Sequence, residues 1–248
     1  MVDRIRRATG PAGRRERRVG GYARLDHDRG RRVGVPEVVL GEGKTVEHLV
    51  GIVRALLEDG RGGFVSRPTP AQLRALERLR PVRGSLRFLA RGRLVRLPGP
   101  LDVRYRAGTV ALLAAGTSDV PVAEEARALL EELGLRVVHA YDVGVAGLHR
   151  LFRALARLER AGPETYLVFA GREGALPTVV AGLVRAPVVG VPTSVGYGRG
   201  GRGEAALTAM LQSCAPVAVV NIDAAVPAAL FAAQRFAARP APFRRKAG

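Results

Sequence analysis

The chain has 248 residues and carries 40 Lys and Arg against 22 Asp and Glu, a formal net charge of +18. A chain of this length can bury a substantial core without crosslinks, and a hydrophobic content of 47% excludes wholesale disorder. Cys214 is the single cysteine, which excludes an internal disulfide framework and metal sites built from clustered cysteines, and favours a cytoplasmic protein.

Residues 1–18 are rich in arginine and lack the apolar run of a secretory signal, so we expect a flexible basic arm. No apolar run reaches the roughly 20 residues that span a bilayer, and we expect no membrane partner. The excess of arginine suggests that the protein binds nucleic acid. However, the sequence has no helix-turn-helix, zinc-finger or RNA-binding motif and few aromatic residues for base stacking. We therefore expect no specific nucleic-acid partner.

Residues 19–105 predict a small α+β domain. We expect strands at residues 37–40 and 63–66, helices at 45–58 and 69–79, and a hairpin over 85–97.

Two motifs in this first domain form a candidate N-terminal site. Asp26 and His27 lie in a run that places two carboxylates around an imidazole. Lys44 lies in a glycine-flanked turn that ends a strand and opens a helix, which is typical of a phosphate or carboxylate site. Val38 occupies the position of the first P-loop glycine, which excludes a Walker A motif.

Residues 106–238 alternate apolar runs of strand length with helical patterns, and residues 239–248 form a C-terminal tail. Nearly continuous apolar strands are typical of a parallel sheet covered on both faces. Five such units predict an α/β fold, a flavodoxin-like doubly wound parallel sheet preceded by the small α+β domain. The expected strands are 109–115, 135–140, 165–170, 187–191 and 217–222, and the expected helices are 120–133, 148–160, 176–184, 204–212 and 226–238.

In such a sheet the ligand binds beyond the carboxyl ends of the strands. The loop after the first strand, with Thr117 and Ser118, offers N–H groups and hydroxyls to an anion, whereas an N-cap role for Asp119 explains the same pattern. Glu173, between two glycines, is either a general base or an exposed turn acid paired with Arg172.

Two further features stay ambiguous on the residues alone. The run G-x-G-x-x-G at 196–201 follows the fourth strand, which is the wrong place for a dinucleotide fingerprint, and it is either a phosphate-closing loop or a plain flexible one. Cys214 precedes the last strand. A lone cysteine is more often inert and buried, whereas a nucleophile needs a populated thiolate.

Several segments are distinctive when taken together, and they lie at residues 23–29, 36–45, 115–119, 141–150, 173–177, 191–198 and 213–223. They closely resemble the LarB family, in one register from about residue 20 to 235. The second domain is similar to the PurE-type phosphoribosylaminoimidazole carboxylase fold, which assembles into octamers.

The resemblance implies a pyridinium-3,5-biscarboxylic acid mononucleotide synthase on the route to the nickel-pincer nucleotide of lactate racemase. The implied substrates are nicotinic acid adenine dinucleotide and CO2 or bicarbonate, with Mg2+ as cofactor, no nickel bound by the protein itself, and a homo-oligomer, an octamer. Cys214 matches the nucleophile and Glu173 the acid that takes the ring proton. The substrate-binding residues carried over are Gly116, Thr117, Ser118, Asp119, His149, Gly171, Gly174, Ser194, Gly196 and Tyr197.

Two departures from the family pattern are the arginine-rich loop at residues 199–202 and Val217 in place of a glycine. One competing interpretation is a PurE-type purine-pathway ribotide carboxylase or mutase, which needs neither a thiol nor a front domain. Another is a non-enzymatic nucleotide-binding regulator that uses its basic arm on nucleic acid.

Overall fold

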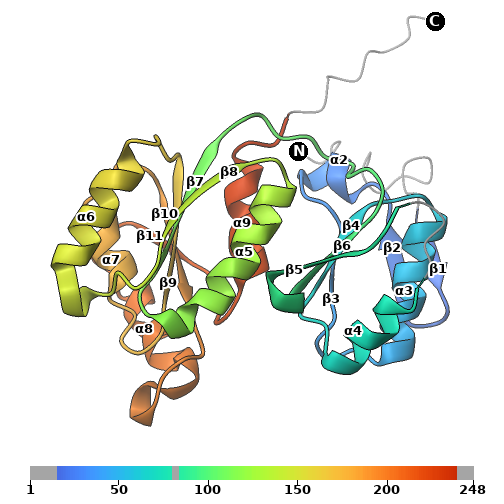
Figure 1. Ribbon diagram of the computed structural model, residues 1–248, viewed down its shortest axis with the longest axis horizontal. Coiled ribbons are helices and arrows are strands. Elements are labelled where there is room, and N and C mark those ends of the chain that lie inside the picture. The colour runs from blue at the N-terminus through green and yellow to red at the C-terminus, as the bar shows by residue number, and fades with distance from the viewer. Residues whose placement is uncertain (1–15, 80–83, 239–248) are drawn as a thin grey trace, which may run out of the picture. The chain divides into compact units, whose positions relative to one another are not determined.

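The structure is a computed structural model that describes residues 16–79 and 84–238 (Figure 1). It contains two compact units. The described residues up to Arg104, with Ala237 and Ala238, form the N-terminal unit, and Tyr105–Phe236 form the C-terminal unit.

The N-terminal unit contains a four-stranded sheet in the order β3-β4-β6-β5. β3 and β4 are parallel and the other pairs are antiparallel. Apolar side chains of α3 pack on the sheet around Val65 and Val95, which buries one face of each element. The predicted strands, helices and hairpin are confirmed. The elements are β3 (Val38–Leu40), α3 (Val46–Glu58), β4 (Gly63–Ser66), α4 (Pro70–Glu77), β5 (Arg87–Leu89), η1 (Ala90–Gly92) and β6 (Leu94–Leu97).

A hairpin of β1 (Glu16–Val19) and β2 (Ala23–Asp26), followed by the short helix α2 (Arg29–Val33), precedes this sheet. Our prediction of a flexible arm is therefore wrong for residues 16–18, which belong to β1. The Arg17 side chain stabilises this strand, because its guanidinium donates hydrogen bonds to the carboxylates of Glu58 and Asp59 at the end of α3. The rest of the predicted arm, and the predicted tail at 239–248, lie outside the described residues.

The C-terminal unit is a five-stranded parallel sheet in the order β11-β10-β9-β7-β8. Helices α5 and α9 cover one face, and α6, α7 and α8 cover the other (Figure 1). The predicted α/β class is confirmed. The elements are β7 (Thr109–Ala114), η2 (Thr117–Asp119), α5 (Val120–Glu132), β8 (Arg136–Ala140), η3 (Val145–Gly147), α6 (Leu148–Glu159), β9 (Thr165–Ala170), α7 (Leu176–Ala181), β10 (Val188–Pro192), η4 (Gly198–Gly203), α8 (Glu204–Leu211), β11 (Val217–Val219) and α9 (Ala225–Gln234).

Two interior strands, β7 and β9, contribute large side chains to the core of this unit. Leu112 and Leu113 of β7 and Tyr166 and Phe169 of β9 are all fully buried, which accounts for the unbroken apolar runs in the sequence. The edge strand β11 is shorter than predicted because it pairs with only three residues of β10. No helix within the described ranges is long and apolar enough to cross a bilayer.

Candidate active site

A cavity of about 430 Å³ opens at the carboxyl ends of β7, β8 and β9. Four loops of the C-terminal unit line it: the η2 loop after β7, the η3 loop after β8, the turn between β9 and α7, and the loop after β10 that carries Val195. Such loops converge because all the strands run in one direction. The volume lies in the range of small-molecule sites.

The Asp119 carboxylate links these loops at the base of the cavity. It is only 4% exposed. Its carboxylate accepts hydrogen bonds from the Gly116 N–H at 2.8 Å, the Gly171 N–H at 3.1 Å and the Thr193 hydroxyl at 2.5 Å. Asp119 does occupy the predicted N-cap position of helix α5, but its side chain makes no capping hydrogen bond to that helix. Asp119 instead joins the ends of β7, β9 and β10 beneath the cavity.

Gly171 permits the close approach of two of these loops. A Cβ atom added to it would lie 2.2 Å from the Val195 carbonyl oxygen and 2.9 Å from the Thr193 hydroxyl oxygen. That carbonyl accepts the Arg172 N–H at 3.1 Å, so the backbones must separate to admit a methyl group.

We expect Gly171→Ala to lower the free energy of unfolding by about 1–3 kcal/mol, the usual cost of overpacking, and to weaken ligand binding in the cavity. Urea unfolding measures the first effect. The matched control is Gly201→Ala, where nothing lies within 4 Å of the added Cβ atom and φ is −60°. Equal stability of the two variants would contradict the close approach at Gly171.

Four charged side chains line the cavity above Asp119. Asp142 and Arg150 form an ion pair across the η3 loop. Arg172 places its guanidinium 4.9 Å from the centre of the Tyr197 ring. Among the described residues Glu173 forms no ion pair, so the predicted alternative in which it pairs with Arg172 is wrong. The Glu173 carboxylate is therefore available to a ligand in the cavity.

The structure brings some of the predicted substrate-binding residues together and leaves others outside the lining. Asp142 and Arg150 line the cavity but were not predicted, because an exposed charge in a loop has no distinctive sequence pattern. The predicted residues in the lining are Gly116, Ser118, Asp119, Gly171 and Glu173. Those outside it are Thr117, His149, Gly174, Ser194, Gly196 and Tyr197.

Cys214 is exposed, which excludes the inert buried alternative. It lies between α8 and β11, at the amino edge of the sheet, and does not line the cavity. The preceding residue anchors the segment, because the Ser213 hydroxyl accepts a hydrogen bond from the Thr178 hydroxyl at 2.9 Å. The thiol is therefore open to solvent on a fixed segment.

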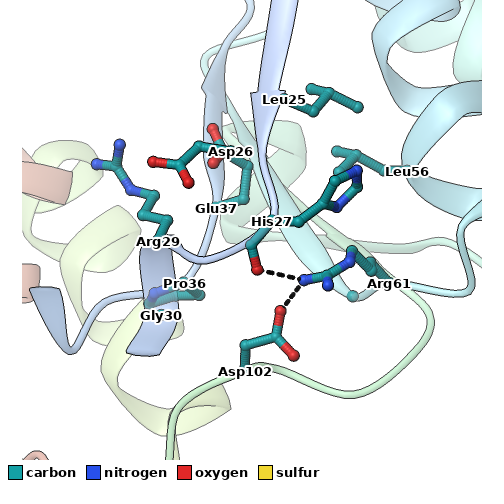
Figure 2. Close-up of a pocket in the computed structure, with 11 residues that line it drawn as sticks. Leu25, Asp26, His27, Arg29, Gly30, Pro36, Glu37, Leu56, Arg61 and Asp102 are labelled. Carbon is teal, nitrogen blue, oxygen red and sulfur yellow. Dashed lines mark hydrogen bonds and ion pairs between the residues drawn. The ribbon is translucent and has the colours of Figure 1, made fainter. Parts of the chain in front are cut away.

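The N-terminal unit has its own small cavity, of about 20 Å³, lined by Asp26 and His27 (Figure 2). The Asp26 carboxylate pairs with Arg32, which lowers the pKa of Asp26. The His27 Nε2 atom lies 3.2 Å from Oδ2 of Asp59. The backbone carbonyl of His27 accepts a hydrogen bond from the Arg61 guanidinium. The cavity has room for about one water, and Asp26 and His27 are both paired with other residues of the same unit. These residues therefore form a structural cluster rather than a ligand site.

Lys44 does not line this cavity, so the predicted N-terminal residues do not form one site. The turn around Lys44 is held by Gln72, whose amide donates to the carbonyls of Gly41 and Lys44.

Burial raises the pKa of the Glu37 carboxyl in the small cavity above its ordinary value of 4.5; Arg29 opposes the shift and Asp26 adds to it. The folded state therefore binds more protons than the unfolded state, and stability is lost as the pH rises from the ordinary pKa through the folded one. We expect Glu37→Gln, which cannot ionise, to be more stable than the unchanged chain at neutral pH, with the difference shrinking toward pH 4. Urea unfolding across this range measures it, with the exposed Glu42→Gln as control. A difference that does not depend on pH would contradict this origin.

Within the described residues, no group of three or more His, Cys, Asp or Glu could hold a metal ion. The Asp119 carboxylate is already occupied by three donors, and Asp142 is paired with Arg150. These residues do not form a Mg2+ site by themselves, and the expected Mg2+ stays a prediction.

Comparison with known proteins covers both units. The protein-family model of the LarB/PurE-like N-terminal domain matches residues 17–97, and the family model of AIR carboxylase matches residues 109–247. An uncharacterized protein from Methanocaldococcus jannaschii is 38% identical over 212 residues, which are 84% of this chain and 82% of that protein.

The chain is also similar to N5-carboxyaminoimidazole ribonucleotide mutases. The N5-carboxyaminoimidazole ribonucleotide mutase of Pyrococcus horikoshii is 33% identical over 138 residues, covering 53% of this chain and 74% of the mutase. The crystal structure of Treponema denticola PurE matches with a TM-score of 0.39 and 20% identity, over 52% of this chain and 88% of that one. With an N-terminal domain of the LarB type ahead of a domain of the AIR carboxylase type, this chain belongs to the LarB family of carboxylase-related proteins.

Proposed function

We propose that the protein carboxylates the pyridinium ring of nicotinic acid adenine dinucleotide and cleaves its phosphoanhydride. The products are pyridinium-3,5-biscarboxylic acid mononucleotide and AMP, for the nickel-pincer nucleotide of lactate racemase. One observation carries the proposal: an exposed thiol, Cys214, in a carboxylase-family chain. The N-terminal domain of the LarB type supports it.

The thiol supplies what the free ring lacks. Addition of the Cys214 thiolate to ring C4 forms a carbon–sulfur bond, neutralises the pyridinium and makes C5 an enamine-like carbon. C5 then attacks CO2 and forms the new carbon–carbon bond. Glu173 takes the C5 proton, and expulsion of the thiolate returns the carbon–sulfur electron pair to sulfur and restores the aromatic cation. Water then cleaves the phosphoanhydride.

The lining of the cavity suits such a substrate. Its charged rim includes Arg150 and Arg172, and guanidinium groups bind phosphate and carboxylate oxygens. Its apolar lining can cover a planar ring, and it consists of Ala115, Val145, Ala146, Ala170, Leu176 and Val195.

Glu173→Gln tests the role of the acid. The amide cannot accept the C5 proton, so we expect turnover to fall by a factor of about 100 or more, the usual range for a general base. The carboxylated adduct on Cys214 should accumulate, and intact-protein mass spectrometry would detect it. Asp142→Asn, in the same cavity, is the matched control. Normal turnover by Glu173→Gln would remove this residue from the mechanism.

A second candidate function is the ribotide carboxylase or mutase reaction, which the likeness to the mutases favours. That reaction uses no thiol. Conversion of N5-carboxyaminoimidazole ribonucleotide, unaffected by Cys214→Ala, would support this candidate in place of the proposed one.

A further inference from the structure

We propose that the hairpin of β1 and β2 binds a nucleoside monophosphate, with the phosphate between Arg18 and Arg24 and the base against Tyr22. The hairpin belongs to the N-terminal unit, and none of its described residues lines the cavity that contains Glu173. It has a cavity of its own, of about 230 Å³, against about 20 Å³ for the small cavity beside Asp26. The larger volume accommodates a base or a phosphate rather than a single water. This cavity is lined by Arg18, Gly20, Gly21, Tyr22, Ala23 and Arg24.

Two arginines of the hairpin carry their charges side by side. Arg18 and Arg24 are opposite each other in the register of β1 and β2, which places their Cβ atoms about 5 Å apart on one face. Both residues are exposed, and neither has an ion pair or a hydrogen bond within the described part of the chain. The two acids of this face, Glu16 and Asp26, lie opposite each other at the next pair along, and Asp26 is paired with Arg32.

This pair of arginines predicts a phosphate subsite. Like charges directly opposite each other weaken a strand pair, and an anion bound between the two guanidinium groups would remove the repulsion. Guanidinium groups bind phosphate through parallel N–H donors that each reach a separate oxygen. A phosphate therefore fits Arg18 and Arg24 better than a single-atom anion does.

Tyr22 supplies an aromatic ring beside this subsite. Its ring stacks on His48 of α3, with the ring centres 4.1 Å apart and the planes inclined by 21°. Its hydroxyl lies against Gly51, where an added Cβ atom would be 2.1 Å from the hydroxyl oxygen. These contacts hold the ring in place, yet 44% of the Tyr22 side chain is exposed. A fixed and exposed ring offers a stacking surface that every base can use, because each base has a flat π face.

A flat base and a phosphate occur together in a nucleotide. The combination of Tyr22 with two guanidinium groups therefore selects nucleoside phosphates as a class, without a preference among the bases. One ring, two charges and a cavity of this size match one nucleotide, whereas a single-stranded nucleic acid needs a groove with successive stacking rings. AMP is a suitable probe, because it has both groups and is a product of the proposed reaction. The inference itself does not depend on that reaction.

Photolabelling locates the site directly. The full-length protein would be irradiated with 8-azido-AMP and digested with trypsin, which cleaves after Arg18 and Arg24 and releases residues 19–24 as one peptide. We expect the label on this peptide. AMP should protect it at concentrations about tenfold or more below those needed of adenosine or inorganic phosphate, since each of these lacks one of the two groups. Labelling confined to other peptides, or equal protection by phosphate, would overturn the assignment. Stronger protection by a 5′-phosphorylated oligonucleotide than by AMP would overturn it in favour of nucleic acid.

Single substitutions test each contact by equilibrium dialysis with labelled AMP. Arg18→Gln and Arg24→Gln should each weaken AMP binding by a factor of about ten or more, the usual loss of a charged hydrogen-bond partner. Tyr22→Leu should weaken AMP binding by a similar factor and leave the binding of inorganic phosphate unchanged. The matched control is Arg54→Gln, which removes an exposed arginine of α3 in the same unit and should bind AMP normally. Equal affinities of Arg24→Gln and Arg54→Gln would overturn the phosphate subsite.

These measurements are independent of catalysis. Because neither Arg18 nor Arg24 has a partner within the described residues, their replacement should leave the circular dichroism spectrum unchanged. A protein that binds AMP at the hairpin but forms no carboxylated mononucleotide would refute the proposed function and leave this site standing. A protein that carboxylates the dinucleotide but takes no label on residues 19–24 would do the reverse.

Discussion

Replacing Cys214 with alanine is expected to abolish carboxylation, with turnover falling by a factor of about 1,000 or more, the scale on which loss of a covalent nucleophile acts. Without the thiol, C5 stays part of an electron-poor aromatic cation that cannot attack CO2. Initial rates of mononucleotide formation measure the effect. Because the side chain is exposed, the stability of the variant should stay within about 0.5 kcal/mol of the unchanged chain.

Cys214→Ser serves as the companion variant. A serine hydroxyl is almost the same size and keeps the surface polar, but it is not ionised near neutral pH, so this variant should be equally inactive. Substantial turnover by either variant would contradict covalent catalysis. Loss of turnover together with loss of stability would instead assign Cys214 a structural role, which its exposure argues against.

Replacing Asp119 with alanine is expected to give the largest loss of stability. The change leaves two backbone N–H groups and one hydroxyl in a buried place without their acceptor. We expect the free energy of unfolding to fall by about 3–5 kcal/mol. The loop that carries Glu173 begins at one of these N–H groups, so turnover should fall as well.

Asp119→Asn separates charge from shape. The amide oxygen can keep the bonds from both Thr193 and Gly171, which share one carboxylate oxygen, but the NH2 group would face the Gly116 N–H, so a smaller loss of about 1–3 kcal/mol is expected. The matched control is Asp142→Asn, whose carboxylate is 55% exposed and whose φ of 57° asparagine tolerates. Equal stability of Asp119→Ala and Asp142→Asn would contradict the role given to Asp119.

The sequence predicts the C-terminal unit well, because its core strands are continuous apolar runs set between helical patterns with clear ends. Strand β9 has its predicted bounds, since both its faces are buried. Strand β1 was missed because Glu16, Arg17 and Arg18 are all charged, so the sequence there lacks the alternation of apolar and polar residues by which a strand is recognised. What orders them is the pairing of Arg17 with Asp59, 42 residues away.

The site was harder to predict than the fold. Gly116, Asp119 and Glu173 were found because strand ends in a parallel sheet define the loops that matter. The structural role of Asp119 could not be found, because its partners Gly171 and Thr193 are 52 and 74 residues away. The separation of Cys214 from the cavity follows from its place before a strand rather than after one, and the resemblance alone gave no sign of it.

The fate of labelled CO2 tests the central claim most directly. The protein would be incubated with nicotinic acid adenine dinucleotide, Mg2+ and 14C-labelled bicarbonate, and the products separated by chromatography. The proposed function predicts one label per mononucleotide formed, released together with one AMP, and no label with Cys214→Ala. A mononucleotide without label, or no mononucleotide at all, would contradict it.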